Sequence, residues 1–261
     1  HTPERLVANA AAIKRAVTVP VITAGRIEPE SADRHIRAGN FDFIGFGRKV
    51  LADPDLPKKL EAGTPEQIRP CIYCYCCVTQ IYILKPVKCA VNPETASERE
   101  RNLIATDQPR HIAVIGGGPG GMEAARRLAL RGHRVSLFER GNRLGGTLQF
   151  ASIAYPPNER LLNWLRAQIR QSSVAVHLNT TATVETLKNQ GVEDVVVATG
   201  GRRDMPAITG SEQDFVFSGD EMRALIMSQD HPELRRKTTA FTRLMVSLGA
   251  KSGLTSRPGL V

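Results

Sequence analysis

The sequence predicts an α/β protein in which two parts with parallel strands flank a cysteine-rich segment. Three observations lead to this fold class. Apolar residues alternate between helical and strand patterns over residues 1–48, all five cysteines fall within residues 71–89, and a glycine-rich turn separates a strand from a helix after residue 111. At 261 residues and 41% hydrophobic composition, the chain is long enough for two compact units.

The first part of the chain reads as helix, strand, helix and strand. Residues 3–17 carry apolar side chains at helical spacing, and the short apolar run 19–23 ends in a glycine turn. A second helix is expected over residues 29–38, with Gly39 as its stop signal, and a buried strand over residues 41–45. This order predicts parallel strands joined by crossover helices.

The cysteines have the spacing of metal ligands. Cys71, Cys74 and Cys77 form a C-x2-C-x2-C run, and Cys89 follows after eleven residues. Such steps curl the chain so that thiolates converge, and one distant cysteine closes a four-thiolate cage that suits a [4Fe–4S] cluster. Structural zinc is the alternative, although its ligands usually come as two separated C-x2-C pairs. Cys76 is expected to be a bystander, but its position beside Cys77 leaves the third ligand open.

A dinucleotide-binding fingerprint follows. Gly116, Gly118 and Gly121 have G-x-G-x-x-G spacing between an expected strand at 112–115 and an expected helix at 122–131. The first glycine permits the tight turn, the second lets a pyrophosphate approach the backbone, and the third lets helix and strand pack closely. The helix N-terminus then offers free N–H groups and a positive dipole end to the phosphates.

Further residues indicate which dinucleotide is bound. Glu139 ends the next expected strand, where a carboxylate can accept hydrogen bonds from both ribose hydroxyls of an adenosine. The pairs Gly145-Gly146 and Thr199-Gly200 resemble the motifs of flavoproteins with two dinucleotide sites, whose first site holds FAD. Either pair taken singly could be ordinary loop glycines, but the presence of both in this order favours FAD over NAD.

Composition argues against two other classes of partner. The formal charge of +9 comes from dispersed Lys and Arg, and aromatics make up only 5%, so nucleic-acid binding is not expected. No stretch approaches the roughly 18 to 20 apolar residues of a membrane span, and no secretory signal is visible, so we expect no membrane partner and a cytoplasmic location.

Taken in order, four segments resemble a known family. Residues 19–39 and 41–59 resemble the final barrel strands, and residues 68–77 and 87–93 the cluster-binding segment, of the NADH:flavin oxidoreductase and 2,4-dienoyl-CoA reductase type of the old yellow enzyme superfamily. The glycine fingerprint follows in the family's order. The resemblance covers roughly residues 1–225. It implies the C-terminal part of a TIM (β/α)8 barrel, a 4Fe-4S segment and an FAD-binding Rossmann-like domain.

The resemblance also implies domain bounds. Residues 1–66 would belong to the FMN-binding barrel, and residues 67–105 would form the cluster segment and a polar connector with little to bury. Residues 106–228 would form part of the FAD/NAD(P)-binding domain, and residues 229–261 a tail or the start of an NAD(P)H subdomain. We expect the isolated chain to be poorly soluble or to lose FMN, because two barrel strands leave an open apolar edge.

The family's FMN phosphate lies in the loops after barrel strands seven and eight, where such barrels generally bind phosphate. The matching residues here are Gly25, Arg26, Gly47 and Arg48. Backbone N–H groups and guanidinium forks suit a phosphate dianion. The alternative is that the two arginines are surface charges at the ends of strands. The sequence departs from the more familiar family pattern, which would put the third cysteine at Val78.

The activity implied by the resemblance is electron transfer from NAD(P)H through FAD, the cluster and FMN to an α,β-unsaturated carbonyl or enoyl thioester. No catalytic residue is named, because the family's proton donor lies in barrel strands that this sequence does not contain. The partners implied are a small-molecule substrate and the nicotinamide cofactor, and homo-oligomerisation stays open. Two alternatives remain, an amine dehydrogenase that exports electrons and a non-catalytic electron-transfer module with FAD and an iron–sulfur cluster.

Overall fold

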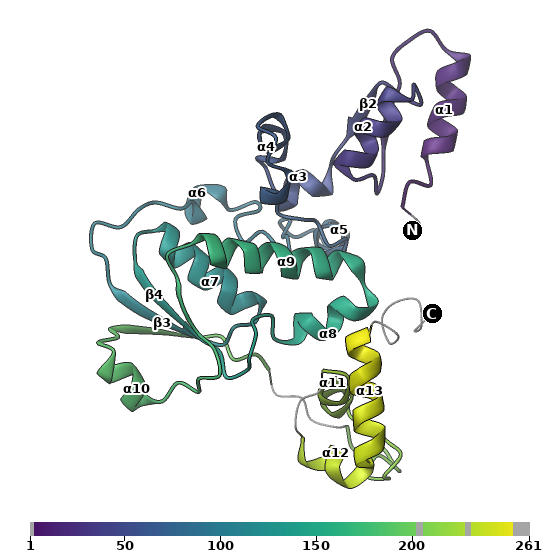
Figure 1. The fold of residues 1–261 in the computed structure, drawn as a ribbon. Coiled ribbons are helices and arrows are strands. Elements are labelled where there is room, and N and C mark those ends of the chain that lie inside the picture. Colours follow the sequence, from purple (N-terminus) through teal and green to yellow (C-terminus); the bar gives the residue numbers. More distant parts are fainter. Residues whose placement is uncertain (1–2, 202–205, 228–230, 253–261) are drawn as a thin grey trace. The chain divides into compact units, whose positions relative to one another are not determined.

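The structure, a computed structural model, describes residues 3–201, 206–227 and 231–252 (Figure 1). The chain forms two compact units, His1–Ser97 and Glu98–Val261. Both are mixed α/β structures whose strands pair in parallel. Among the described residues, none of the helices is both long and apolar enough to cross a membrane.

The first unit begins with the expected alternation of helices and strands. Helix α1 (Val7–Ala16) precedes β1 (Ile22–Ala24), and α2 (Pro29–Arg37) precedes β2 (Phe43–Gly45). The strands start two or three residues later than expected, and α1 starts four residues later. Gly39 adopts φ +72° directly after α2, which confirms the expected stop signal.

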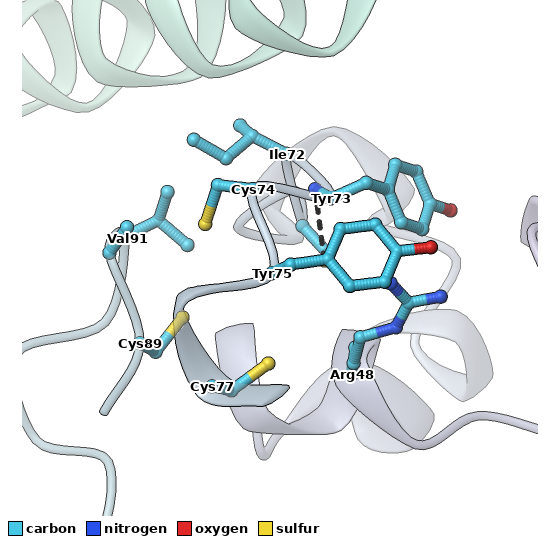
Figure 2. A pocket seen from close by; sticks show the side chains of 10 residues that line it. Arg48, Ile72, Tyr73, Cys74, Tyr75, Cys77, Cys89 and Val91 are labelled. Carbon is cyan, nitrogen blue, oxygen red and sulfur yellow. Dashed lines mark hydrogen bonds between the residues drawn. The ribbon is translucent and has the colours of Figure 1, made fainter. Parts of the chain in front are cut away.

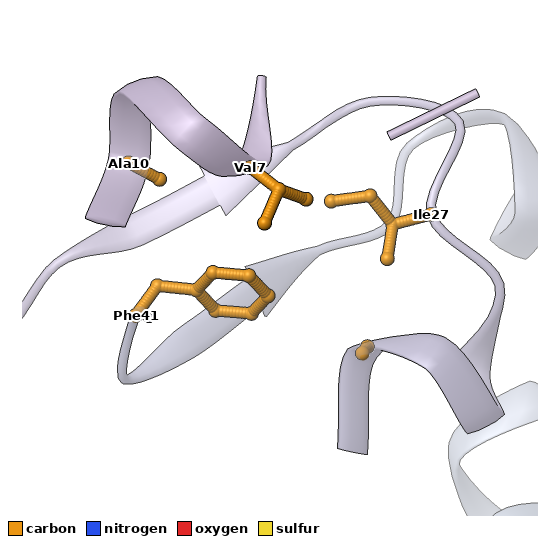
Figure 3. Packing of buried hydrophobic residues seen from close by; sticks show 5 residues of the cluster. Val7, Ala10, Ile27 and Phe41 are labelled. Atoms are coloured by element: carbon orange, nitrogen blue, oxygen red, sulfur yellow. The ribbon is translucent and has the colours of Figure 1, made fainter. Parts of the chain in front are cut away.

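The core of this unit lies between the helices and one face of the two-stranded sheet. Figure 3 shows Val7, Ala10, Ile27 and Phe41 gathered in one cluster, which also includes Ala32. Ile27 and Phe41 are almost fully buried. Burial of each of these two side chains therefore stabilises the fold by about 1.5–3 kcal/mol.

The other face of this sheet is open. The register pairs Ile22 with Phe43, and these side chains are 70% and 56% exposed. Thr23, which points to the opposite face, is buried. The sheet therefore presents large apolar side chains to solvent on one side.

Four short helical segments complete the first unit. They are α3 (Arg48–Ala52), α4 (Leu56–Glu61), the 3-10 turn Pro65–Gln67 and α5 (Cys76–Tyr82). The connector after the cysteines buries more than the sequence indicated, because Asn92 and Thr95 both donate hydrogen bonds to the Leu51 carbonyl, at 3.0 and 2.9 Å. These bonds tie the chain after Cys89 back to α3.

The second unit is built on a four-stranded parallel sheet. Its strand order is β5-β4-β3-β6, formed by β3 (His111–Ile115), β4 (Arg134–Phe138), β5 (Ala175–His177) and β6 (Asp194–Val197). The first strand thus lies in the middle, with the second on one side and the last on the other, which is the order of a Rossmann-type sheet. The short β5 was not expected from the sequence.

Helices cover this sheet and extend beyond it. The long helices α7 (Pro119–Leu130) and α9 (Pro156–Gln171) pack on each other, and α7 contacts β3, β4 and β6. The remaining helices are α6 (Glu98–Arg101), α8 (Thr147–Ala154), α10 (Val184–Asn189), α11 (Gly219–Ile226), α12 (Pro232–Lys237) and α13 (Ala240–Ser252). Figure 1 shows α9 running alongside α7.

Candidate functional site

The glycine fingerprint forms the turn between β3 and α7. Gly116 has φ +110°, and a Cβ there would lie 2.8 Å from the carbonyl carbon of Ala198. A Cβ at Gly121 would overlap the carbonyl oxygen of Gly116 and lie 3.0 Å from its carbon. At Gly118, by contrast, a Cβ would meet nothing within 4 Å. The first and third glycines are thus required by packing, whereas the second leaves the backbone open to an approaching ligand.

Glu139 closes this turn from the end of β4. Its carboxylate accepts a hydrogen bond from the Gly117 amide at 2.8 Å and another from the Gly141 amide at 2.7 Å. The side chain is half-buried. The acid therefore lies beside the glycine turn with its oxygens held by backbone N–H groups.

The other two predicted glycine segments meet the same turn. Gly145 donates its amide hydrogen to the Gly117 carbonyl at 2.7 Å, and a Cβ on Gly146 would lie 3.0 Å from the Gly118 Cα. At the end of β6, the Thr199 Cα lies near Gly116, where an added Cβ would be 3.1 Å from it. Gly200 follows with φ +82°. Four segments far apart in sequence thus converge at the carboxyl ends of the strands, where open parallel sheets bind ligands.

A wide cavity lies next to the Gly145-Gly146 turn. Its volume is about 1350 Å³, including the part open to solvent, and it is lined by residues of α8, α9 and α11. Arg166 contributes to its wall and donates two hydrogen bonds to the Leu144 carbonyl, at 2.6 and 3.0 Å. Burial, and then the charge of Arg143, lower the Arg166 pKa. The buried Gln149 Oε1 has no hydrogen-bond partner among the described residues. Sequence reasoning missed these lining residues, which belong to no motif.

In the first unit, the cysteines line one pocket (Figure 2). The four predicted ligands Cys71, Cys74, Cys77 and Cys89 all contribute to its wall, whereas Cys76 does not. Val78, where the more familiar family pattern has a cysteine, is also outside the pocket wall. All five cysteines are free thiols. Within the described part of the chain, no three His, Cys, Asp or Glu side chains are placed to hold a single metal ion.

The surroundings of Cys71 in this pocket favour its thiol over its thiolate. Burial raises the pKa of Cys71, and the neighbouring Cys89 raises it further. The Tyr73 amide, which donates to the Cys71 sulfur at 3.4 Å, and the cations Lys49 and Arg48 act in the opposite direction. Backbone N–H donors and nearby cations are the groups that stabilise thiolate sulfur once it is charged.

The two predicted phosphate arginines are brought together by the cysteine loop. Arg26 follows β1, and Arg48 begins α3 and also lines the cysteine pocket. Both guanidinium groups lie over the rings of Tyr73 and Tyr75, as detailed below. A hydrogen bond from Arg48, and interactions with Arg26, lower the pKa of the Tyr75 phenol. Gly25 and Gly47 are exposed, and neither would meet another atom if it carried a Cβ.

A Rossmann-type sheet with this glycine turn, together with a thiol-lined pocket, defines the class of nucleotide-dependent redox proteins. Comparison with known families agrees. Residues 110–246 match the pyridine nucleotide-disulphide oxidoreductase family model, and residues 2–67 match the NADH:flavin oxidoreductase / NADH oxidase family model. The chain belongs to the pyridine nucleotide-disulphide oxidoreductases over its second half and, as a whole, to the NADH:flavin oxidoreductases of the old yellow enzyme family.

Individual relatives fall in the same class. A bilirubin reductase of Mediterraneibacter gnavus is 41% identical over 211 residues, which cover 78% of this chain and 33% of the relative. A structure of 2-naphthoyl-CoA reductase superposes with a TM-score of 0.80 at 28% identity, covering 88% of this chain and 36% of that one. Histamine dehydrogenase from Rhizobium sp. 4-9 gives a TM-score of 0.74 at 32% identity, covering 79% and 31%. The chain spans about a third of the length of the curated relatives it matches.

Proposed function

We propose that this chain is the electron-transferring part of a flavin reductase that carries FAD, a [4Fe–4S] cluster and FMN. The observation that carries the proposal is the position of Arg48, which lines the same pocket as the four cysteines while it belongs to the predicted phosphate pair. A phosphate-binding arginine beside a thiol cage would put a flavin and a cluster close enough for electron transfer. Residues 1–66 would accordingly form the end of a TIM barrel.

The residues present fit each cofactor. Cys71, Cys74, Cys77 and Cys89 would each bind one iron, and their common position in the lining of one pocket, as free thiols, supports this assignment. Arg48 would receive the FMN phosphate, since its buried Nη1 has no hydrogen-bond partner among the described residues. A dianion at that position would satisfy this donor with a charge-assisted hydrogen bond. Arg26, Gly25 and Gly47 would complete the phosphate site.

The second unit fits FAD in the same way. The pyrophosphate would lie against Gly118 and the free N–H groups at the start of α7, where no side chain intervenes. Glu139, which lies beside the glycine turn, would accept hydrogen bonds from the adenosine ribose, and the remainder of the cofactor would extend past Gly146 and Thr199. When bound, the flavins would supply hydride chemistry and the cluster would carry single electrons. The protein's part is to position these groups and to limit their contact with water.

The substrate we propose is an α,β-unsaturated carbonyl or enoyl thioester, reduced with electrons from NAD(P)H. Similarity to 2-naphthoyl-CoA reductase and to a cinnamate reductase of Clostridium sporogenes supports this direction. Similarity to histamine dehydrogenase supports the second candidate, an amine dehydrogenase that exports electrons.

The test uses the complete polypeptide that carries these residues, purified without oxygen. The proposed function predicts that a 2-enoate, as acid or thioester, accelerates oxidation of NADH or NADPH and is itself reduced. Reduction of an external one-electron acceptor by an amine, with no enoate reduction, would instead support the dehydrogenase. Absence of both activities and of bound flavin in the purified protein would refute both candidate functions.

A further inference from the structure

The cysteine loop contains two strained tyrosines. Tyr73 and Tyr75 adopt φ values of +52° and +61°, in the left-handed region that disfavours bulky side chains. Glycine or asparagine would adopt this backbone at lower cost. Strain of this kind persists only where surrounding contacts hold it, and it is concentrated at functional sites. The question is therefore what the two rings contact.

Both rings contact the arginine pair. The Arg26 Cζ lies 4.7 Å from the centroid of the Tyr73 ring and 5.6 Å from that of Tyr75. The Arg48 Cζ lies 5.4 Å from the Tyr73 centroid and 4.7 Å from the Tyr75 centroid. Cations within about 6 Å of an aromatic centroid are attracted to the ring face. Two guanidinium groups that would otherwise repel each other are thus held together by the two rings, as Figure 2 shows for Arg48 and Tyr75.

The contact between the two tyrosines and the two arginines is anchored to the rest of the first unit through Tyr73. This ring is 7% exposed, and its hydroxyl donates a hydrogen bond to Glu28 Oε1 at 2.9 Å. Glu28 in turn forms an ion pair with the buried Lys49, whose ammonium lies 5.3 Å from the Tyr73 centroid. The backbone amide of Tyr73 donates to the Cys71 sulfur. The same residue therefore contacts a thiol of the cysteine pocket and a predicted phosphate ligand.

We propose that Tyr73 and Tyr75 are positioning residues that orient Arg26 and Arg48 for the flavin phosphate, so that FMN affinity depends on whether the cysteine loop holds its cluster. The inference rests on the proposed function, in which the arginines bind the FMN phosphate and the cysteines bind the cluster. Binding of a cluster by Cys71, Cys74 and Cys77, which flank the two tyrosines, would add to the contacts that hold both backbones in the left-handed conformation, and a loop without the cluster would support the arginines less well. Because binding free energies are linked, FMN would strengthen retention of the cluster to the same degree.

Three variants of the complete polypeptide, purified without oxygen, separate positioning from simple packing. Tyr75→Phe keeps the ring. Tyr75→Asn removes the ring and also relieves the backbone strain, because asparagine tolerates positive φ. Tyr82→Asn is the matched control, since Tyr82 is 83% exposed at the end of α5. The FMN dissociation constant is measured by flavin fluorescence on the iron-containing fraction, with iron content determined in parallel.

The expected result is about a tenfold weaker FMN affinity for Tyr75→Asn, with Tyr75→Phe within about threefold of wild type and Tyr82→Asn unchanged. Removal of iron with a chelator should weaken FMN binding of wild type by a similar factor and add little to Tyr75→Asn. Unchanged FMN affinity in Tyr75→Asn, or equal effects of the Asn and Phe variants, would overturn the positioning role. A wild-type protein that binds neither iron nor FMN would refute the proposed function itself, and this inference with it.

Discussion

Two glycines of the fingerprint, three residues apart, should respond to alanine in opposite ways. A Cβ at Gly121 would overlap the Gly116 carbonyl oxygen, and neither backbone can move without separating β3 from α7. Overpacking of this kind costs about 1–3 kcal/mol. For a unit of this size, each kcal/mol lowers Tm by about 2–4 °C. Gly121→Ala should therefore lower the melting temperature of the flavin-free protein by several degrees.

Gly118→Ala should leave the fold intact and weaken FAD binding. Gly118 has φ −72° and ψ 178°, which alanine adopts readily, and a Cβ there would touch nothing. Alanine lowers the entropy of the unfolded chain, which stabilises the folded protein by about 0.4–1 kcal/mol. It is also a poorer N-cap than glycine, which destabilises the folded protein by a similar amount. The net change in stability is expected within about 0.5 kcal/mol. A methyl group against the pyrophosphate should disrupt its hydrogen bonds and weaken FAD affinity about tenfold to a hundredfold.

The assay for this pair combines thermal unfolding of the flavin-free proteins with titration of FAD. We expect a low melting temperature for Gly121→Ala, and a near wild-type melting temperature with poor FAD affinity for Gly118→Ala. If Gly118→Ala bound FAD like the wild type, or if both variants lost equal stability, the roles assigned to the two positions would be refuted.

Three further predictions test other parts of the molecule. Cys77→Ser should abolish the iron content of anaerobically purified protein and Cys76→Ser should preserve it, because of these two adjacent cysteines only Cys77 lines the thiol pocket; the reverse result would reassign the third ligand. Phe43→Ser should raise the soluble yield of the 261-residue chain, since this side chain is 56% exposed on the open face of the β1–β2 sheet, and an unchanged yield would show that this face does not limit solubility. Burial tends to raise the Glu221 pKa, but the Ser218 amide and the buried Lys237 outweigh this effect and lower the pKa below its usual value. Protection of α11 and α12 from hydrogen exchange should therefore be complete above about pH 4.3 and fall as the pH drops further. The Glu221→Gln variant should show reduced protection already at neutral pH.

Local features of the second unit could be predicted from the sequence. The glycine turn, the strand before it and the helix after it each depend on short-range requirements that single residues reveal. Other features depend on how the elements pack, and the local sequence does not reveal them. These are the hydrogen bond between Gly145 and Gly117 and the hydrogen bonds that Gly117 and Gly141 donate to Glu139. Strand β5 was missed because it is only three residues long, and so short an apolar segment does not distinguish a strand from a loop.

The cysteine loop shows more clearly which features the sequence alone reveals and which it does not. The spacing of the cysteines selected the four that line the pocket and left Cys76 outside it. The role of Tyr73 and Tyr75 could not be predicted, because nothing in the local sequence reveals a positive φ or a contact with Arg26, which lies 47 and 49 positions earlier. Their partners are set by tertiary structure, and only the assembled unit reveals them.

The central claim is that the thiol pocket and the glycine turn together serve electron transfer. The most direct test is metal, sulfide and flavin analysis of the complete polypeptide purified without oxygen. We expect about four iron and four sulfide per chain, together with FAD and FMN. One zinc per chain, with neither sulfide nor flavin absorbance, would contradict it.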